Sequence, residues 1–262
     1  MPAAQSLPVR RVGSPWQRAM AKSPRRIRPL VQGYFATARD SLIRPKRLYS
    51  VVTITPLQPE GVSAMLGVRA LLWVNIILAT LLLCFGVGTL HALMVNVPPA
   101  SLLPTRLDVV APDYETRYVA DTTLLWEGLL AAPPVALLLL GLTTLETLGL
   151  RTFGRQRGWR VTRNVAWTVC AHASFGWVVG GLLAMLSHAL SLTPPGQAGL
   201  LKMLGWIDEN FGYFNFAGRG LQEWLPRCLG LFLGMLVFET VVYFGIRRCR
   251  FANETISRPS QA

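Results

Sequence analysis

Four long hydrophobic segments alternate with polar segments along this 262-residue chain. About 20 apolar residues cross a hydrocarbon core as an α-helix, because each helical residue adds about 1.5 Å. The pattern therefore predicts an all-α fold, a polytopic membrane helix bundle with four transmembrane helices. The predicted spans lie at about residues 68–95, 122–150, 165–192 and 228–246, within a membrane domain of residues 30–253.

Prolines and glycines inside these segments predict local geometry. Pro133 and Pro134 remove backbone donors from the second span, so we expect a kink there. Glycines spaced four apart in the third and fourth spans allow two helix backbones to approach closely in lipid. These are Gly176, Gly180, Gly230 and Gly234, and we expect the two spans to pack together.

The chain begins with a basic segment, residues 1–29, that contains several prolines and no acidic residue. Such a composition cannot build a core, so we expect a disordered tail. Apolar positions then recur at helical spacing from Leu30 to Ile43, which predicts a short N-terminal interfacial helix. A solvated helix packed on a cytoplasmic partner is the alternative. Residues 254–262 are expected to form a short C-terminal tail.

The distribution of charge predicts the orientation. Lys and Arg are concentrated before the first span, between the second and third, and after the fourth, whereas Asp and Glu prevail in residues 96–121 and 193–226. The positive-inside rule then puts both termini in the cytoplasm, and we expect the inner (plasma) membrane. The Arg-rich start leaves an organelle membrane as the alternative. Residues 193–226 also carry many aromatic side chains and are expected to lie on the outer membrane surface.

The amino-acid composition indicates which partners to expect. Hydrophobic residues make up 52% of the chain and charged residues 15%, with a net charge of +13. No base-reading motif accompanies this charge, so we expect no nucleic acid and instead a bilayer with anionic headgroups. The predicted headgroup or partner contacts are Arg44, Lys46, Arg47, Arg155, Arg157 and Arg160. The sequence has no nucleotide-binding, hydrolase or CxxC motif, so we expect no cofactor and no catalytic residue.

Polar side chains inside a span are costly and are therefore candidates for function. Counting from the span borders, Asn75, His172 and Glu239 share a layer in the inner half of the bilayer, where a His172–Glu239 pair is geometrically possible. We expect an interhelical tie, with a proton or ion relay as the alternative.

A second polar layer lies near the outer surface. Its residue types are those of a catalytic zinc site: His91, Glu127 and His188. No short metal-binding motif links them, so we interpret them as ordinary interfacial residues and keep metal binding as the alternative.

Three strings carry a family resemblance: Leu42–Arg47 before the first span, Trp159–Trp177 with its Ala-His-Ala-Ser centre, and Tyr243–Arg248 in the tail. With them the layout resembles the bacterial branch of the Yip1-like (YIP1 domain) integral membrane proteins. The resemblance implies a compact helical membrane domain, usually with five spans, and no established catalytic residues. In eukaryotic relatives it implies a role in membrane traffic with small GTPases.

The sequence thus favours a non-enzymatic multi-pass membrane protein that organises protein partners or lipids through a basic cytoplasmic face, with a homo-oligomer among the expected assemblies. The alternative is a small oligomeric transporter or channel that uses the kinked second helix and the His172/Glu239 polar layer. A membrane-embedded metal enzyme ranks last.

Overall fold

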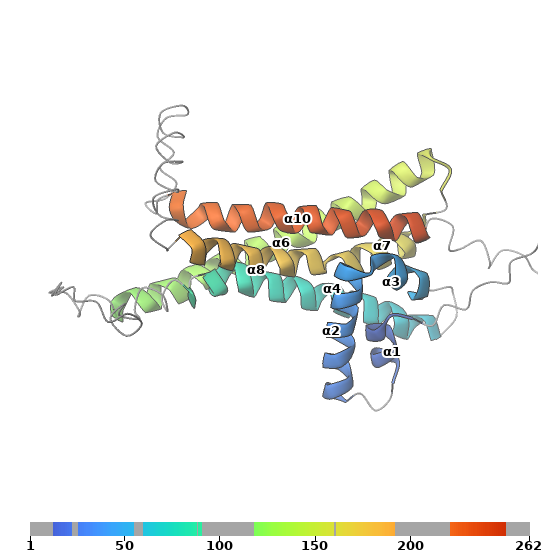
Figure 1. Cartoon of the computed structure of the whole chain (residues 1–262), viewed down its shortest axis with the longest axis horizontal. Helices are drawn as coiled ribbons and strands as arrows, with labels where there is room; N and C mark the ends of the chain where they lie inside the picture. Colours follow the sequence, from blue (N-terminus) through green and yellow to red (C-terminus); the bar gives the residue numbers. More distant parts are fainter. Residues whose placement is uncertain are drawn as a thin grey trace, which may run out of the picture. The chain divides into compact units, whose positions relative to one another are not determined.

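The computed structural model describes only part of the chain, and its regular elements there are helices (Figure 1). The described residues are 13–22, 26–54, 60–87, 89–90, 118–159, 161–191 and 221–249. Most of the two predicted acidic segments, residues 96–121 and 193–226, lies outside them, so the expected surface position of the aromatic segment stays a prediction.

Among the described residues, four helical segments are long and apolar enough to cross a membrane, which confirms the predicted all-α fold with four such helices. The segments are Gly67–Gly86, Gly128–Gln156, Arg163–Leu190 and Arg227–Cys249. They belong to α4 (Glu60–Leu81) with the π-helix η1 (Leu82–Gly86), α6 (Tyr118–Gln156), α7 (Arg163–Ala173) with α8 (Phe175–Ser191), and α10 (Leu221–Cys249).

Helix α6 is longer than the predicted second span. It continues through Pro133 and Pro134 without ending, so the kink there stays a prediction. Helix α6 ends at Gln156, and Gly158, two residues later, adopts a positive φ of 70°. The Trp159 amide donates to the Gly154 carbonyl (2.8 Å) and the Gly158 amide to that of Arg155 (3.0 Å), which is the Schellman end of a helix. Arg155 therefore lies on α6, although the predicted second span ends at about residue 150.

The N-terminal region departs from the expected disorder. Residues 15–21 form α1 (Pro15–Ala21), because Ser14 and Gln17 make a capping box and proline occupies the first helical turn. Helix α2 (Ile27–Ile43) follows and ends before Pro45, since the residue preceding a proline disfavours the helical conformation. Helix α3 (Pro45–Val51) then begins on that proline. Whether α2 lies at a membrane interface stays a prediction.

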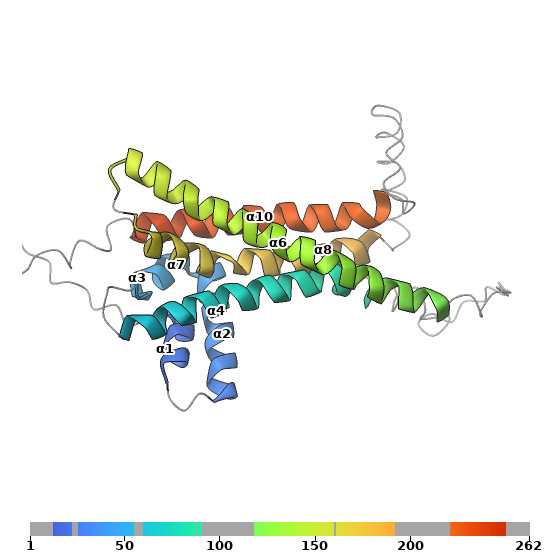
Figure 2. The same ribbon diagram turned by 180° about the vertical axis from the view of Figure 1, so that it is seen from behind.

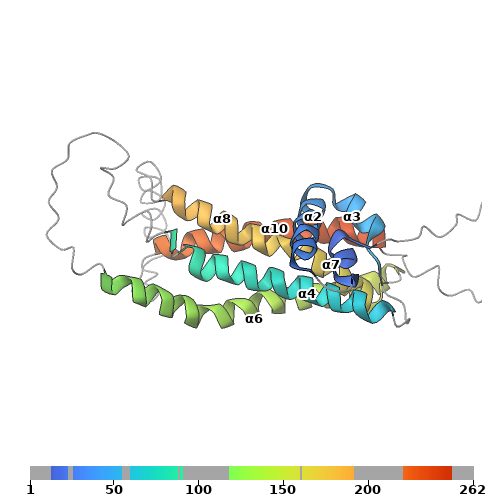
Figure 3. The same cartoon turned by 90° about the horizontal axis from the view of Figure 1, so that it is seen from below.

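The contacts divide the chain into two compact units. The first lies within Met1–Ile76, Leu140–Gly176 and Leu236–Ala262. In it α1 and α2 run side by side, across the direction of α7 (Figures 1 and 2), and Figure 3 shows α1, α2 and α3 grouped beside α7. Gly176 lies against the Phe238 backbone, where a side-chain carbon would come within 2.5 Å of the amide nitrogen.

The second unit lies within Ile77–Leu139 and Trp177–Met235. Here α8 and α10 approach through glycines, as the spacing predicts. A Cβ on Gly180 would lie 2.7 Å from the Gly230 carbonyl oxygen and 3.0 Å from Gly234 Cα. Backbone contact this close leaves no space for any side chain.

Adding a single methyl group at this contact should therefore push α8 and α10 apart. We expect Gly180→Ala to lower the free energy of unfolding by about 2 kcal/mol, through overpacking against backbone atoms that cannot move aside. Gly141→Ala is the matched control, because nothing lies within 4 Å of its added Cβ, and it should be neutral or slightly stabilising. Thermal unfolding in mild detergent measures both, and equal effects would contradict the close approach.

Candidate functional site

The third membrane-length segment is interrupted at Ser174, in the first unit. Helix α7 ends at Ala173 and α8 begins at Phe175. The last carbonyls of a helix have no partner within it, and in an apolar environment they need other donors. The hydroxyl of Ser174 donates to the Ala171 carbonyl at 2.7 Å, and the hydroxyl of Ser41 in α2 donates to the His172 carbonyl at 2.7 Å. The break is thus closed by side chains, one of them from the N-terminal region.

His172 itself is fully buried, with both ring nitrogens in contact. Its Nδ1 lies 2.8 Å from the Thr168 carbonyl, which only accepts, so Nδ1 carries the proton. In the neutral ring Nε2 then accepts from the Ser14 hydroxyl, at 3.1 Å. The same Ser14 oxygen caps α1 by accepting from the Gln17 amide at 3.2 Å. One hydroxyl therefore joins the start of α1 to the end of α7.

A second chain of hydrogen bonds reaches the break from α4. The Asn75 side chain donates to the Ser174 hydroxyl at 2.8 Å and accepts from the Tyr34 hydroxyl of α2 at 2.7 Å. Asn75 and Ser174 are fully buried. The chain Tyr34–Asn75–Ser174 ties three helices together at one level, and it gives a predicted intramembrane polar residue a structural partner.

Further contacts fix α1 and α3 on the same unit. The Trp16 indole donates to the Gly67 carbonyl at 2.6 Å, and its ring packs with Leu71 and Phe175 in a buried cluster. The Tyr49 hydroxyl donates to the Val169 carbonyl at 3.0 Å, and Tyr49 is fully buried. We call the bonds made by Ser14, Ser41, Tyr49, His172 and the chain Tyr34–Asn75–Ser174 the junction network.

The predicted layer of Asn75, His172 and Glu239 is only partly assembled. Asn75 and His172 both join the junction network, whereas the Glu239 side chain is exposed on α10. The two ring nitrogens of His172 contact Thr168 and Ser14. The expected His172–Glu239 pair is therefore replaced by partners that the sequence did not single out. Ser14 lies in a segment that was expected to be disordered. The Ser-Pro-x-Gln pattern that begins at Ser14 is a helix-capping signal, and it could have predicted α1.

Two of the three residues in the predicted zinc set have no described side chain, so metal binding there stays a prediction. His91 lies outside the described residues, and the described part of Glu127 is its backbone in α6. His188 is buried in α8. Among the side chains that the structure describes, no group of three His, Cys, Asp or Glu residues is arranged to hold a metal ion.

Cationic side chains gather in the first unit, around the ends of its helices. Arg44, Lys46 and Arg47 are exposed around α3, and Arg155 and Arg157 at the end of α6. Some rest on aromatic rings, as interfacial cations do. Lys46 Nζ lies 5.5 Å from the Phe244 ring centroid and Arg157 Cζ 5.4 Å from that of Trp159. Arg160, the last predicted contact, lies outside the described residues.

These cations have few acidic neighbours. Within the described part of the chain the salt bridge found is Arg39–Asp40, at 3.1 Å between neighbouring residues. The basic face is defined as Arg44, Lys46, Arg47, Arg155, Arg157, Arg247 and Arg248. It is positive, and among the side chains that the structure describes no carboxylate pairs with it.

Helix α2 adds an exposed apolar stripe to this unit. Ile27, Val31 and Phe35 follow one another at every fourth position, with 81%, 47% and 66% of their surface exposed. Residues four apart lie on one face of a helix. The buried residues of the same helix, Gly33, Thr37 and Ser41, form the opposite stripe. Helix α2 is therefore amphipathic with its apolar side outward.

Burial also changes the acidity of the tyrosines that hold α2 and α3. It raises the pKa of Tyr34 from 10.0 to about 12 and that of Tyr49 well above its usual value. Both hydroxyls therefore stay protonated near neutral pH and remain hydrogen-bond donors to Asn75 and Val169.

The four membrane-length helices define the class, a multi-pass helical membrane protein. No protein-family model, curated protein or solved structure matches the chain. The resemblance to Yip1-like proteins accordingly stays a hypothesis that rests on its three sequence strings.

The Tyr34–Asn75 bond should contribute measurably to stability. We expect Tyr34→Phe and Asn75→Ala to be non-additive, with a coupling free energy of about 0.5–1 kcal/mol, because each removes the same buried hydrogen bond. Thermal unfolding of the two single variants and the double variant measures it. Ser50→Ala combined with Asn75→Ala is the control pair and should be additive, since the Ser50 hydroxyl donates locally to the Arg47 carbonyl. Additive losses for Tyr34 and Asn75 would contradict the bond.

The raised pKa of Tyr34 also predicts a pH dependence. Because the folded state holds this proton more tightly, the stabilisation is complete below pH 10 and is lost as the pH rises towards about 12. We expect the stability advantage of wild type over Tyr34→Phe to shrink as the pH rises above 10. Tyr49 is present in both proteins, so its contribution cancels. A difference that stayed constant up to pH 11 would show that Tyr34 is not buried as described.

Proposed function

We propose that this chain is a non-enzymatic membrane protein, with both termini in the cytoplasm, that organises anionic lipids or acidic protein partners through its basic face. The observation that carries the proposal is the gathering in the first unit of exposed cations that pair with no carboxylate among the described side chains. Each Lys or Arg near an anionic membrane surface contributes about 1 kcal/mol of attraction. A group of this size therefore favours an anionic partner strongly.

The amphipathic α2 supports the same function. Its apolar stripe and the flanking Arg26, Arg28 and Arg39 are the pattern of a helix that lies in the headgroup region. Its direction across α7 agrees with a helix in the membrane plane if the four spans run along the membrane normal (Figures 1 and 2). The proposed inner (plasma) membrane topology and the Yip1-like resemblance are consistent with this arrangement.

A transporter or channel is less well supported. It would need titratable groups that are free to exchange protons or ions, but His172 is engaged with Thr168 and Ser14. Asn75 likewise has two partners. We therefore interpret this layer as an interhelical tie.

Charge removal on the basic face tests the proposal. The triple variant Arg47→Gln, Arg155→Gln, Arg157→Gln removes three exposed charges and leaves the junction network intact. We expect protein purified from membranes in mild detergent to lose most of its retained anionic phospholipid and its reproducible protein partners. Lipid analysis and proteomics of the same sample measure both.

The matched control is the triple Lys variant at the same positions, which keeps the charge and should retain what wild type retains. Protease accessibility of tags at both ends checks that neither variant inverts in the membrane. If the Gln variant recovers as much lipid and protein as wild type, the basic residues serve topology alone and the proposal is wrong.

A further inference from the structure

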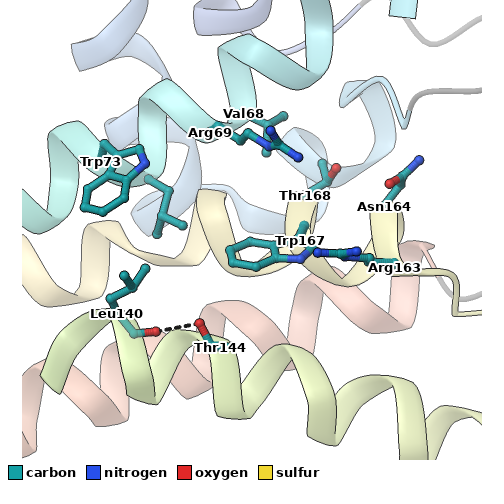
Figure 4. A pocket seen from close by; sticks show the side chains of 10 residues that line it. Val68, Arg69, Trp73, Leu140, Thr144, Arg163, Asn164, Trp167 and Thr168 are labelled. Atoms are coloured by element: carbon teal, nitrogen blue, oxygen red, sulfur yellow. Dashed lines mark hydrogen bonds between the residues drawn. The ribbon is translucent and has the colours of Figure 1, made fainter. Parts of the chain in front are cut away.

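A groove in the first unit combines two arginines with two tryptophans. It has a volume of about 350 Å³ and is bounded by α4, α6 and α7. Figure 4 shows Arg69 and Trp73 coming from α4, Arg163 and Trp167 from α7, and Leu140 and Thr144 from α6. All these residues belong to the first unit.

The same spacing occurs on both cationic helices. Arg69 precedes Trp73 by four residues, and Arg163 precedes Trp167 by four. In an α-helix this is about one turn, so each arginine lies roughly 6 Å nearer the helix start than its tryptophan. In the proposed topology both helices enter the membrane from the cytoplasm. Each arginine then lies at headgroup level and each indole at the depth that tryptophan prefers.

Helix α6 supplies the same gradient in the opposite direction. Thr144, nearer its cytoplasmic end, is polar, and Leu140, one turn deeper, is apolar. The Thr144 hydroxyl donates to the Leu140 carbonyl at 2.8 Å (Figure 4). In the proposed topology each wall thus places one polar side chain, Arg69, Arg163 or Thr144, about one turn nearer the cytoplasm than Trp73, Trp167 or Leu140. This order suits a ligand with a charged head and a hydrocarbon tail.

The groove is positive and opens sideways. Arg69 and Arg163 are exposed, and neither forms a salt bridge with a carboxylate among the described residues. Trp73 has 51% of its surface exposed, so the apolar part of the groove faces the surroundings of the helices. The volume is at the low end of the roughly 300–1,000 Å³ of ligand pockets. It suits a headgroup whose tails continue along the outside of the helices.

We propose that this groove binds one anionic phospholipid, with its phosphate between Arg69 and Arg163 and the start of its acyl chains against Trp73 and Trp167. The inference rests on the proposed function and names the ligand class of one defined site within it. Two guanidinium groups suit the phosphate, because arginine presents several donors in a planar fork.

Native mass spectrometry in mild detergent tests the site, with phosphatidylglycerol as the titrated lipid. We expect wild type to bind one molecule more tightly than the others, and the variant Arg69→Gln, Arg163→Gln to bind that molecule roughly tenfold more weakly. The matched control, Arg18→Gln, Lys22→Gln, removes the same charge at exposed positions in and just after α1, outside both the groove and the basic face. It should keep the first lipid.

Two further titrations distinguish a phospholipid from a free phosphate as the ligand. Glycerol phosphate and inorganic phosphate carry the charge without tails and should displace the lipid only weakly. Phosphatidylcholine carries tails and a phosphate but no net charge, and should bind more weakly than phosphatidylglycerol. Displacement by either tail-less phosphate at the lipid's own concentration would overturn the lipid assignment. The variant Arg69→Lys, Arg163→Lys keeps the charge and should bind with intermediate affinity even if the Gln variant unfolds.

The outcomes also separate this site from the wider proposal. If the groove variant binds its first lipid as wild type does while the basic-face variant loses lipid, the groove assignment is wrong and the proposed function stands. If neither variant loses lipid and the basic-face variant also keeps its protein partners, both are wrong.

Discussion

The requirement that every backbone carbonyl in an apolar environment has a donor shapes the first unit of this protein. Its third membrane-length segment is interrupted at Ser174, which leaves carbonyls at the end of α7 that the helix cannot satisfy. Two hydroxyls, those of Ser174 and Ser41, supply donors to Ala171 and His172. Because Ser41 lies in α2, the break and the N-terminal helices depend on each other.

This dependence explains why a basic, proline-containing N-terminal segment folds at all. On its own α1 has 7 residues, about two helical turns, and is far too short to be stable in water. It is held because Trp16 bonds to the Gly67 carbonyl and Ser14 to the His172 ring. The stabilising energy comes from tertiary contacts, which composition does not reveal. The expected disorder was wrong for residues 15–21 for that reason, whereas residues 1–12 lie outside the described part of the chain.

The sequence predicted the features that depend on local patterns. Apolar length predicted four membrane-length helices, and the glycine spacing predicted the approach of α8 to α10. It did not predict the break at Ser174, because no proline or glycine stands at that residue and serine alone is a weak signal in a helix. It also paired His172 with Glu239, since depth was counted along separate spans. The ring instead faces α1, a direction that only the tertiary structure determines.

Helix α7 connects the junction network to the lipid groove. Its residues from Val165 to Ala173 are nearly all buried, so its position is fixed on several sides. Thr168 lines the groove, and its carbonyl contacts Nδ1 of His172 at 2.8 Å. His172 in turn is held by Ser14. The arrangement of α1 therefore determines where α7 presents Arg163 and Trp167. The proposed recognition of an anionic headgroup depends on such rigid support, because a point charge on a mobile loop gives attraction without selectivity between lipids.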